Sequence, residues 1–101
     1  MGMCIIGARE VENYQRNYHA QVVDIRDAEE YREYHIRGAI HVPVDEVKDF
    51  MKRADKNRIY IFYCEHGSFS FQVAKRYVRE GFQICSLAGG LQSYRKWLSG
   101  E

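Results

Sequence analysis

The sequence predicts an α/β fold of three layers, in which helices cover both faces of a five-stranded parallel sheet. Short apolar runs alternate with amphipathic segments about five times along the chain, which is the β-α pattern of a parallel sheet. The strongest run, IYIFY at residues 59–63, is continuously apolar, as expected for a strand buried on both faces. The length of 101 residues predicts a single domain that spans residues 1–101.

Each expected strand is a short apolar run. The first is weak, and the second is rich in the β-branched residues that favour strands. Pro43 stops the third strand because it has no backbone N–H to donate, and Gly89 and Gly90 end the fifth. The expected strands span residues 3–6, 20–25, 38–42, 59–63 and 84–87.

The expected helices are placed by apolar spacing and by the residues at their ends. Asp27 and Glu30 have the spacing of a capping box, which opens a short helix that ends near Tyr34. Asp45 can cap the next helix, and Gly81 stands where a left-handed residue ends a helix. The expected helices lie at about residues 11–18, 27–34, 45–51, 70–80 and 91–98.

Composition and charge exclude several kinds of protein. Lys and Arg number 15 against 14 Asp and Glu, so no global field favours nucleic acid or a membrane surface as a partner. No apolar stretch is long enough to span a bilayer, and the first residues lack the features of a signal peptide. Three cysteines without a Cys-x-x-Cys motif favour a reduced, cytoplasmic protein, with Cys4 and Cys85 as core residues.

Cys64 stands at the end of the strongest predicted strand, where parallel sheets bind their ligands. Small or polar residues follow it, and a helical pattern then begins. The N-terminus of a helix presents unpaired N–H groups and a partial positive charge, which stabilise a thiolate. Gly67 permits a sharp turn, Ser68 and Ser70 can donate hydroxyl hydrogen bonds, and Ser70 can cap the helix. This pattern favours a nucleophilic cysteine.

Two other interpretations of Cys64 stay open at this point. An unpaired cysteine is commonly a small buried apolar residue. Cys64 and His66 also form a Cys-x-His pair that could bind a metal, but no second pair follows at the spacing of a zinc site. The other histidines, His19, His35 and His41, are scattered along the chain. We therefore expect no metal.

Three stretches of the sequence resemble the rhodanese-like domain, a sulfurtransferase fold shared with dual-specificity cell-cycle phosphatases. VVDIRDAEEYREYHIRGAIHVPVDEV is similar to the family's Val-Asp-x-Arg, Glu-Tyr and His-Ile-x-Gly-Ala-x-x-x-Pro pattern. IYIFYCEHGSFSFQVAKRYVREGF resembles its strand, cysteine loop and helix, and CSLAGGLQSYRKWL contains its Leu-x-Gly-Gly. Together the three stretches span most of the chain from residue 20 onward.

The resemblance implies a reaction and a site. Cys64 corresponds to the family's catalytic cysteine, which takes a sulfane sulfur from a small donor or persulfide and passes it to a nucleophile such as a thiol, which an acceptor protein can carry. No cofactor is implied. Asp24 and Arg26 match a pair that braces the loop, a structural role that we favour over substrate contact. The implied active-site loop consists of Glu65, His66, Gly67, Ser68, Phe69 and Ser70.

The loop departs from the family pattern at one important position. Many active members carry a cation in the loop, often an Arg five positions after the cysteine, where this chain has Phe69. Since Glu65 adds negative charge, a dianionic donor such as thiosulfate gains little here. The phosphatase branch needs an Arg six positions after the cysteine to clamp phosphate, but Ser70 stands there. The alternative to a sulfurtransferase is a catalytically weak binding or regulatory module.

Overall fold

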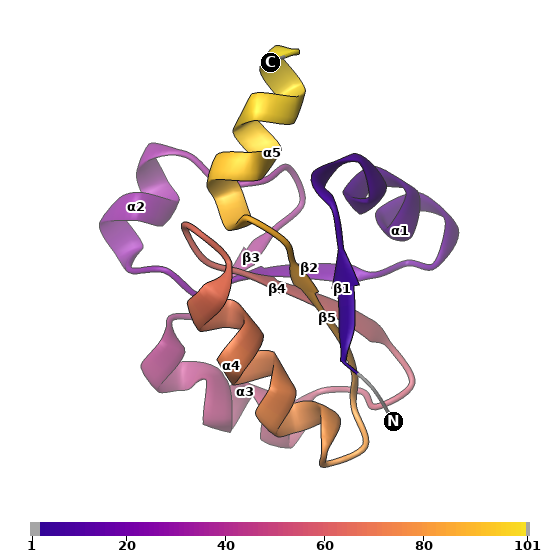
Figure 1. The fold of residues 1–101 in the computed structure, drawn as a ribbon. Coiled ribbons are helices and arrows are strands. Elements are labelled where there is room, and N and C mark those ends of the chain that lie inside the picture. The colour runs from indigo at the N-terminus through magenta and orange to yellow at the C-terminus, as the bar shows by residue number, and fades with distance from the viewer. Residues whose placement is uncertain (1–2, 101) are drawn as a thin grey trace.

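The computed structural model describes residues 3–100, which fold into a five-stranded sheet with helices on both faces (Figure 1). The order of the strands across the sheet is β1-β5-β4-β2-β3, and every neighbouring pair is parallel. The predicted three-layer α/β fold is therefore confirmed. The strands are β1 (Cys4–Ile6), β2 (Gln21–Asp24), β3 (Ile40–His41), β4 (Ile59–Tyr63) and β5 (Gln83–Leu87).

Five α-helices and two short 3-10 helices connect the strands within the described residues. They are η1 (Ala8–Glu10), α1 (Val11–Asn17), α2 (Ala28–Glu33), η2 (Val44–Glu46), α3 (Val47–Arg53), α4 (Ser68–Val78) and α5 (Gly90–Ser99). Helices α1 and α5 pack on one face of the sheet, and α3 and α4 on the other. No helix in the range 3–100 has the length and apolar character that crossing a membrane requires.

Strand β4 runs through the middle of the core. Ile61 and Tyr63 contribute to the apolar cluster under α1 and α5, whereas Tyr60 and Phe62 contribute to the cluster under α3 and α4. This division follows from the strand period of two, which turns successive side chains to opposite faces. All four side chains are buried, which confirms the prediction that this strand is covered on both sides.

The order of the strands brings two sequence-distant segments to one edge of the sheet. Strands β2 and β4 are neighbours, and Asp24 lies opposite Tyr63 in their register. Because the strands are parallel, the residues after each of them meet at the same edge: Arg26 after β2 and Cys64 after β4. Ile25 extends the pairing by donating its N–H to the carbonyl of Tyr63 at 3.2 Å. This is the carboxyl edge, where open α/β sheets bind ligands.

Two predicted helix N-caps are wrong and one is confirmed. Helix α4 begins at Ser68, because Gly67 and not Ser70 is its N-cap. Gly67 has a φ of +102°, which residues with a Cβ disfavour. Asp45 lies inside η2, and no side chain caps α3. Asp27 does cap α2, since its carboxylate accepts the N–H of Glu30 at 3.1 Å.

The expectation that all three cysteines are reduced is wrong. Cys4 of β1 and Cys85 of β5 are register partners in adjacent strands, with their Cα atoms 4.4 Å apart and their sulfurs joined in a disulfide. The two residues are separated by 81 positions in the sequence, and only the order of the strands brings them together. The cysteine count therefore no longer favours a reducing compartment. Cys64 is a free, buried thiol.

Replacing both Cys4 and Cys85 with Ala should lower the free energy of unfolding by about 2–4 kcal/mol, because the disulfide restricts the unfolded chain. Denaturant unfolding of the wild type and the double variant under non-reducing conditions measures this difference. Alkylation of the unreduced, unfolded wild type should label only Cys64. Labelling of all three cysteines would contradict the disulfide.

Candidate active site

The sulfur of Cys64 lies against the backbone at the start of α4. Its Sγ accepts hydrogen bonds from the N–H groups of Gly67 at 3.2 Å and Ser70 at 3.3 Å. The first turn of a helix offers such donors because they have no partner within the helix, and the helix dipole makes this end positive. The side chain is nearly enclosed, since Cys64 is only 7% exposed. The arrangement therefore stabilises negative charge on Sγ.

A second helix end holds the backbone around Cys64 from the other side. The N–H of Leu91 donates to the carbonyl of Cys64 at 2.9 Å, and the N–H of Gln92 donates to the carbonyl of Glu65 at 3.1 Å. Both donors belong to the first turn of α5, whose N–H groups also need partners outside the helix. The start of the loop is thus fixed by α5, while its end forms the first turn of α4.

Glycines allow these two segments to approach closely. A Cβ on Gly90 would lie 2.5 Å from the carbonyl oxygen of Cys64, and one on Gly67 would lie 2.9 Å from the backbone nitrogen of Gly89. Gly67, Gly89 and Gly90 all have positive φ angles as well. A larger residue at Gly90 would displace the backbone that carries the thiol.

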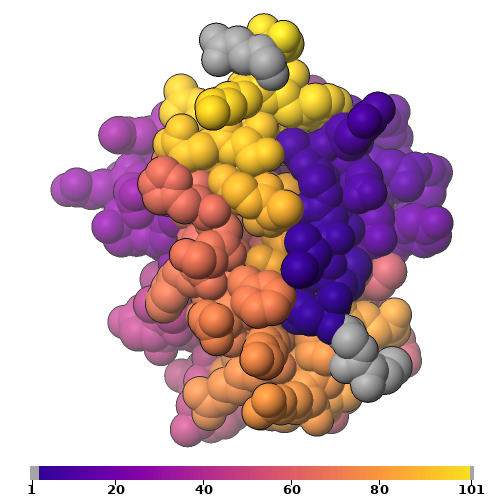
Figure 2. All heavy atoms as spheres, in the orientation of Figure 1, coloured from indigo at the N-terminus to yellow at the C-terminus, as the bar shows by residue number. Residues whose placement is uncertain are grey.

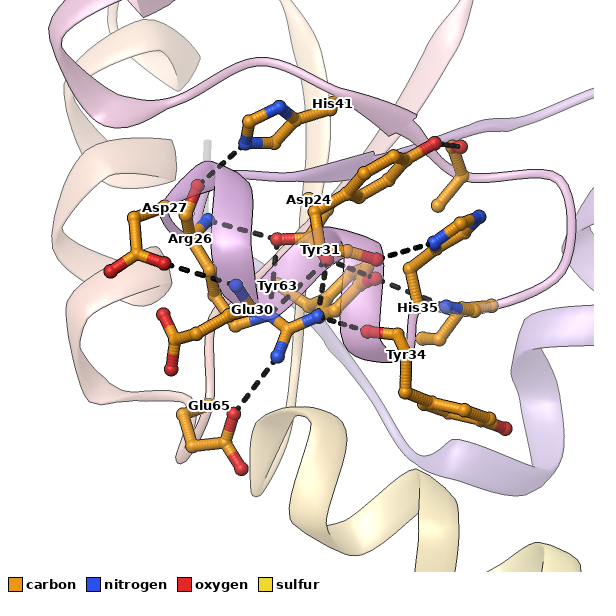
Figure 3. Close-up of polar contacts among 12 residues, drawn as sticks. Asp24, Arg26, Asp27, Glu30, Tyr31, Tyr34, His35, His41, Tyr63 and Glu65 are labelled. Atoms are coloured by element: carbon orange, nitrogen blue, oxygen red, sulfur yellow. Dashed lines mark hydrogen bonds and ion pairs between the residues drawn. The ribbon is translucent and has the colours of Figure 1, made fainter.

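A buried network beside the loop is centred on Asp24 (Figure 3). Arg26 donates from Nε and Nη2 to the Asp24 carboxylate at 2.8–3.2 Å, and from Nη2 to the carbonyl of Tyr34 at 2.5 Å. Tyr63 donates its hydroxyl to Asp24 at 2.5 Å and accepts the N–H of Ile36 at 3.1 Å. Asp24 and Arg26 are both buried, and an ion pair in such a place is tolerated only when its hydrogen bonds are satisfied.

The network fixes the charge states of Arg26 and Tyr63. Burial lowers the pKa of Arg26, but its hydrogen bonds and charge attraction to Asp24 outweigh this and raise the pKa above its ordinary value. Burial raises the pKa of Tyr63, and the hydrogen bond that it donates to Asp24 raises it further. Arg26 therefore remains a cation and Tyr63 a neutral donor throughout the physiological range.

Glu65 connects this network to α5. Its Oε1 pairs with Nη1 of Arg26 at 3.1 Å, as Figure 3 shows, and its Oε2 accepts a hydrogen bond from the side chain of Gln92. The sequence alone presents Glu65 as an isolated charge in the loop. In the structure its carboxylate joins the segment after β2 to the helix after β5, so it positions the loop.

A pocket of about 360 Å³ opens over Cys64. Its apolar wall consists of Ile25, Val44 and Phe69, and Phe69 is half exposed. Three carboxylates line it, from Asp27, Glu30 and Glu65, whereas Arg26 is the only permanent cation that residues 3–100 contribute to its lining. Since Arg26 already pairs with Asp24 and Glu65, the charge around the pocket is negative overall.

The predicted loop residues divide into two groups. Gly67 and Ser70 are buried beneath the sulfur, and the Ser70 hydroxyl bonds to the carbonyl of Gly67 and to the hydroxyl of Ser86. The other four, Glu65, His66, Ser68 and Phe69, line the pocket. No cluster of three potential metal ligands occurs among residues 3–100.

Sequence reasoning missed other residues of this region. Tyr63 lies in an apolar run. Its hydroxyl is the one sequence signal of a polar contact there, because a buried tyrosine usually needs a hydrogen-bond partner. Three other residues reach the site only through the tertiary structure: Gln92, the cap residue Asp27 and Glu30 of α2. No local sequence pattern indicates that they belong to the site.

Comparisons with known proteins identify the family to which this chain belongs. A family model described as the Rhodanese-like domain matches residues 7–96. The thiosulfate sulfurtransferase GlpE of Coxiella burnetii is 35% identical over 75 residues, which cover 73% of this chain and 70% of that protein. The chain belongs to the rhodanese-like domain family, as its sequence motifs predict.

Solved structures agree with this assignment. A rhodanese-like domain protein from Staphylococcus aureus is similar with a TM-score of 0.81 and 28% identity, over 91% of each chain. Reduced CoADR-RHD from Bacillus anthracis gives a TM-score of 0.87 at 20% identity, which shows the fold alone. That match covers 97% of this chain but only 17% of the longer Bacillus protein.

The close approach at Gly90 predicts different results for two glycine substitutions. Gly81→Ala should cost about 1–2 kcal/mol of unfolding free energy, because its φ is positive but no atom lies within 4 Å of the added Cβ. Gly90→Ala should cost about 1–3 kcal/mol more, because its Cβ would also meet the backbone of Cys64 and Glu65. Urea unfolding measures both values. Equal losses would contradict the close contact.

Proposed function

We propose that this chain is a sulfurtransferase that carries sulfane sulfur as a persulfide on Cys64 and passes it to a thiol or another nucleophile. The observation that carries the proposal is the pair of backbone N–H groups, from Gly67 and Ser70, that donate to Sγ at the start of α4. Membership of the rhodanese-like family and the similarity to a protein named as a thiosulfate sulfurtransferase support it.

The proposed reaction consists of two nucleophilic displacements. The Cys64 thiolate attacks the sulfane sulfur of the donor, the new Sγ–S bond forms, and the donor's own bond to that sulfur breaks with the electron pair leaving on the donor. An acceptor thiolate then attacks the terminal sulfur, and the Sγ–S bond breaks to regenerate the Cys64 thiolate. Each step only moves an electron pair between sulfur atoms, so it needs no metal or organic cofactor.

The loop backbone suits the charges of this cycle. Negative charge lies first on Sγ and then on the terminal sulfur, one bond farther out. Gly67 and Ser70 donate to the first position, and the N–H groups of the pocket-lining loop residues are the candidates for the second. Because Leu91 and Glu65 hold the loop in place, these dipoles are oriented before the reaction, which is how enzymes stabilise developing charge.

The charge around the pocket favours an organic persulfide over thiosulfate as the donor. Three carboxylates line the pocket, and Arg26, the one permanent cation in its lining among residues 3–100, is already paired. A dianion therefore approaches against an unfavourable field, whereas Phe69, Val44 and Ile25 offer apolar contact to an organic carrier. This acidic pocket is also the observation that favours the second candidate function, a binding module with little catalysis.

Incubation with a sulfane donor should add one sulfur atom to the wild-type protein, because the Cys64 thiolate attacks the donor. Intact-mass measurement after treatment with thiosulfate, and separately with an alkyl persulfide, detects the product. Cys64→Ser should gain no sulfur from either donor. The absence of added sulfur on the wild type with every donor, or an equal gain on Cys64→Ser, would refute the sulfurtransferase and leave the binding module.

Placing a cation at the pocket should improve the use of thiosulfate. We expect Phe69→Arg to raise kcat/KM for thiosulfate about tenfold, because a charge-assisted hydrogen bond to the donor contributes about 1.5 kcal/mol or more. Steady-state kinetics with thiosulfate measures this change. Phe69→Met, which has a similar length and no charge, is the matched control. If the Met variant improves as much as the Arg variant, charge is not the reason.

A further inference from the structure

A second hollow lies on the other side of the active-site loop. It has a volume of about 570 Å³ and is formed by η1 and the first turns of α5. His66 lines both this hollow and the pocket over Cys64. Figure 2 shows the indigo N-terminal segment and the yellow C-terminal helix meeting on one face, with the coral residues of the loop beside them. We call this hollow the η1–α5 groove.

The charge of the η1–α5 groove is opposite to that of the pocket. Arg9 and Lys96 line it, both are exposed, and neither forms an ion pair with another residue in the range 3–100. Two carboxylates bond to residues of its lining: Glu10 accepts the N–H of Gly7, and Glu65 accepts a hydrogen bond from Gln92 while it also pairs with Arg26. The groove thus offers two unpaired cations to an anionic ligand.

The groove also contains an exposed aromatic side chain. Trp97 lines it with 39% of its surface exposed, and Phe69, 50% exposed, stands on the neighbouring loop. Tryptophan and arginine are enriched where proteins contact one another, and they carry a large share of the binding energy there. A groove with cations and an indole ring therefore fits a polypeptide that has acidic residues and an apolar side chain.

We propose that the η1–α5 groove docks an acidic segment of the protein that exchanges sulfur with Cys64. This inference rests on the proposed sulfurtransferase function for the identity of the partner as a sulfur donor or acceptor. The acidic residues lie beside Arg9 and Lys96, an apolar side chain contacts Trp97, and the sulfur-bearing end passes His66 into the pocket. The carboxylates around the pocket repel the acidic part of the segment, so the two regions together fix its direction.

The single tryptophan of the chain, Trp97, reports on binding directly. The probe is a short synthetic peptide rich in Asp and Glu with one leucine and no cysteine. Its titration into the wild-type protein should give a saturable change in tryptophan fluorescence, and calorimetry should give the same affinity. A peptide of equal length with Asn and Gln in place of the acidic residues should not bind. Because no sulfur moves, failure of the sulfurtransferase function would leave this result unaffected.

Variants locate the binding site. Arg9→Gln with Lys96→Gln should weaken the acidic peptide about tenfold, because each exposed pair contributes modestly and two act together. Lys75→Gln with Arg79→Gln removes the same charges from exposed positions at α4 and should leave the affinity unchanged. Thermal unfolding of each variant verifies folding. No binding by either method, equal binding of the amide peptide, or equal weakening by both pairs of substitutions would overturn the proposal.

Discussion

The carboxylate of Asp24 is fully buried at the carboxyl edge of the sheet. The need to compensate its charge fixes the positions of the neighbouring side chains and of the loop that follows Cys64. Arg26 pairs with it, and Tyr63 donates a hydrogen bond to it. Since a buried charge without partners is strongly destabilising, both side chains are confined to single positions. Arg26 then has one nitrogen left for Glu65, the residue directly after Cys64. In this way the ion pair in the core determines where the loop begins.

The first turns of two helices, α4 and α5, also hold the loop in place. Helix α5 donates backbone N–H groups to the carbonyls of Cys64 and Glu65, whereas α4 donates its own to the sulfur. The first turns of both helices need partners outside their own helix, and the loop supplies them. The thiol is therefore held by backbone contacts from both sides. In the proposed function, such placement of the thiol lowers the reorganisation that the reaction requires.

Local sequence signals are sufficient to predict the fold, and they place Cys64 at the centre of the candidate site. Strand and helix patterns alternate clearly, Asp27 caps its helix as its spacing with Glu30 indicates, and Cys64 stands at a strand end before a helix. The sequence pattern predicts too late a start for α4, because the positive φ of Gly67 makes glycine the cap. That conformation is a property of the folded loop.

The long-range contacts that sequence reasoning missed depend on which strands become neighbours. The disulfide between Cys4 and Cys85 requires β1 to lie beside β5, and the partners of Glu65 come from the segments after β2 and β5. Contacts between segments so far apart in the chain leave no periodic trace in the sequence. The acidic character of the pocket arises in the same way, since Asp27 caps α2, Glu30 lies within α2 and Glu65 belongs to the loop.

The disulfide has a consequence for the lifetime of sulfur on Cys64. Of the three cysteines in the chain, two are bonded to each other, and Cys85 belongs to the apolar cluster on the face of the sheet opposite to that of Cys64. In the proposed cycle, the persulfide therefore meets no second thiol of its own chain that could discharge it. The sulfur stays on Cys64 until another molecule enters the pocket. The proposed persulfide can therefore persist between the encounter with the donor and the later encounter with the acceptor.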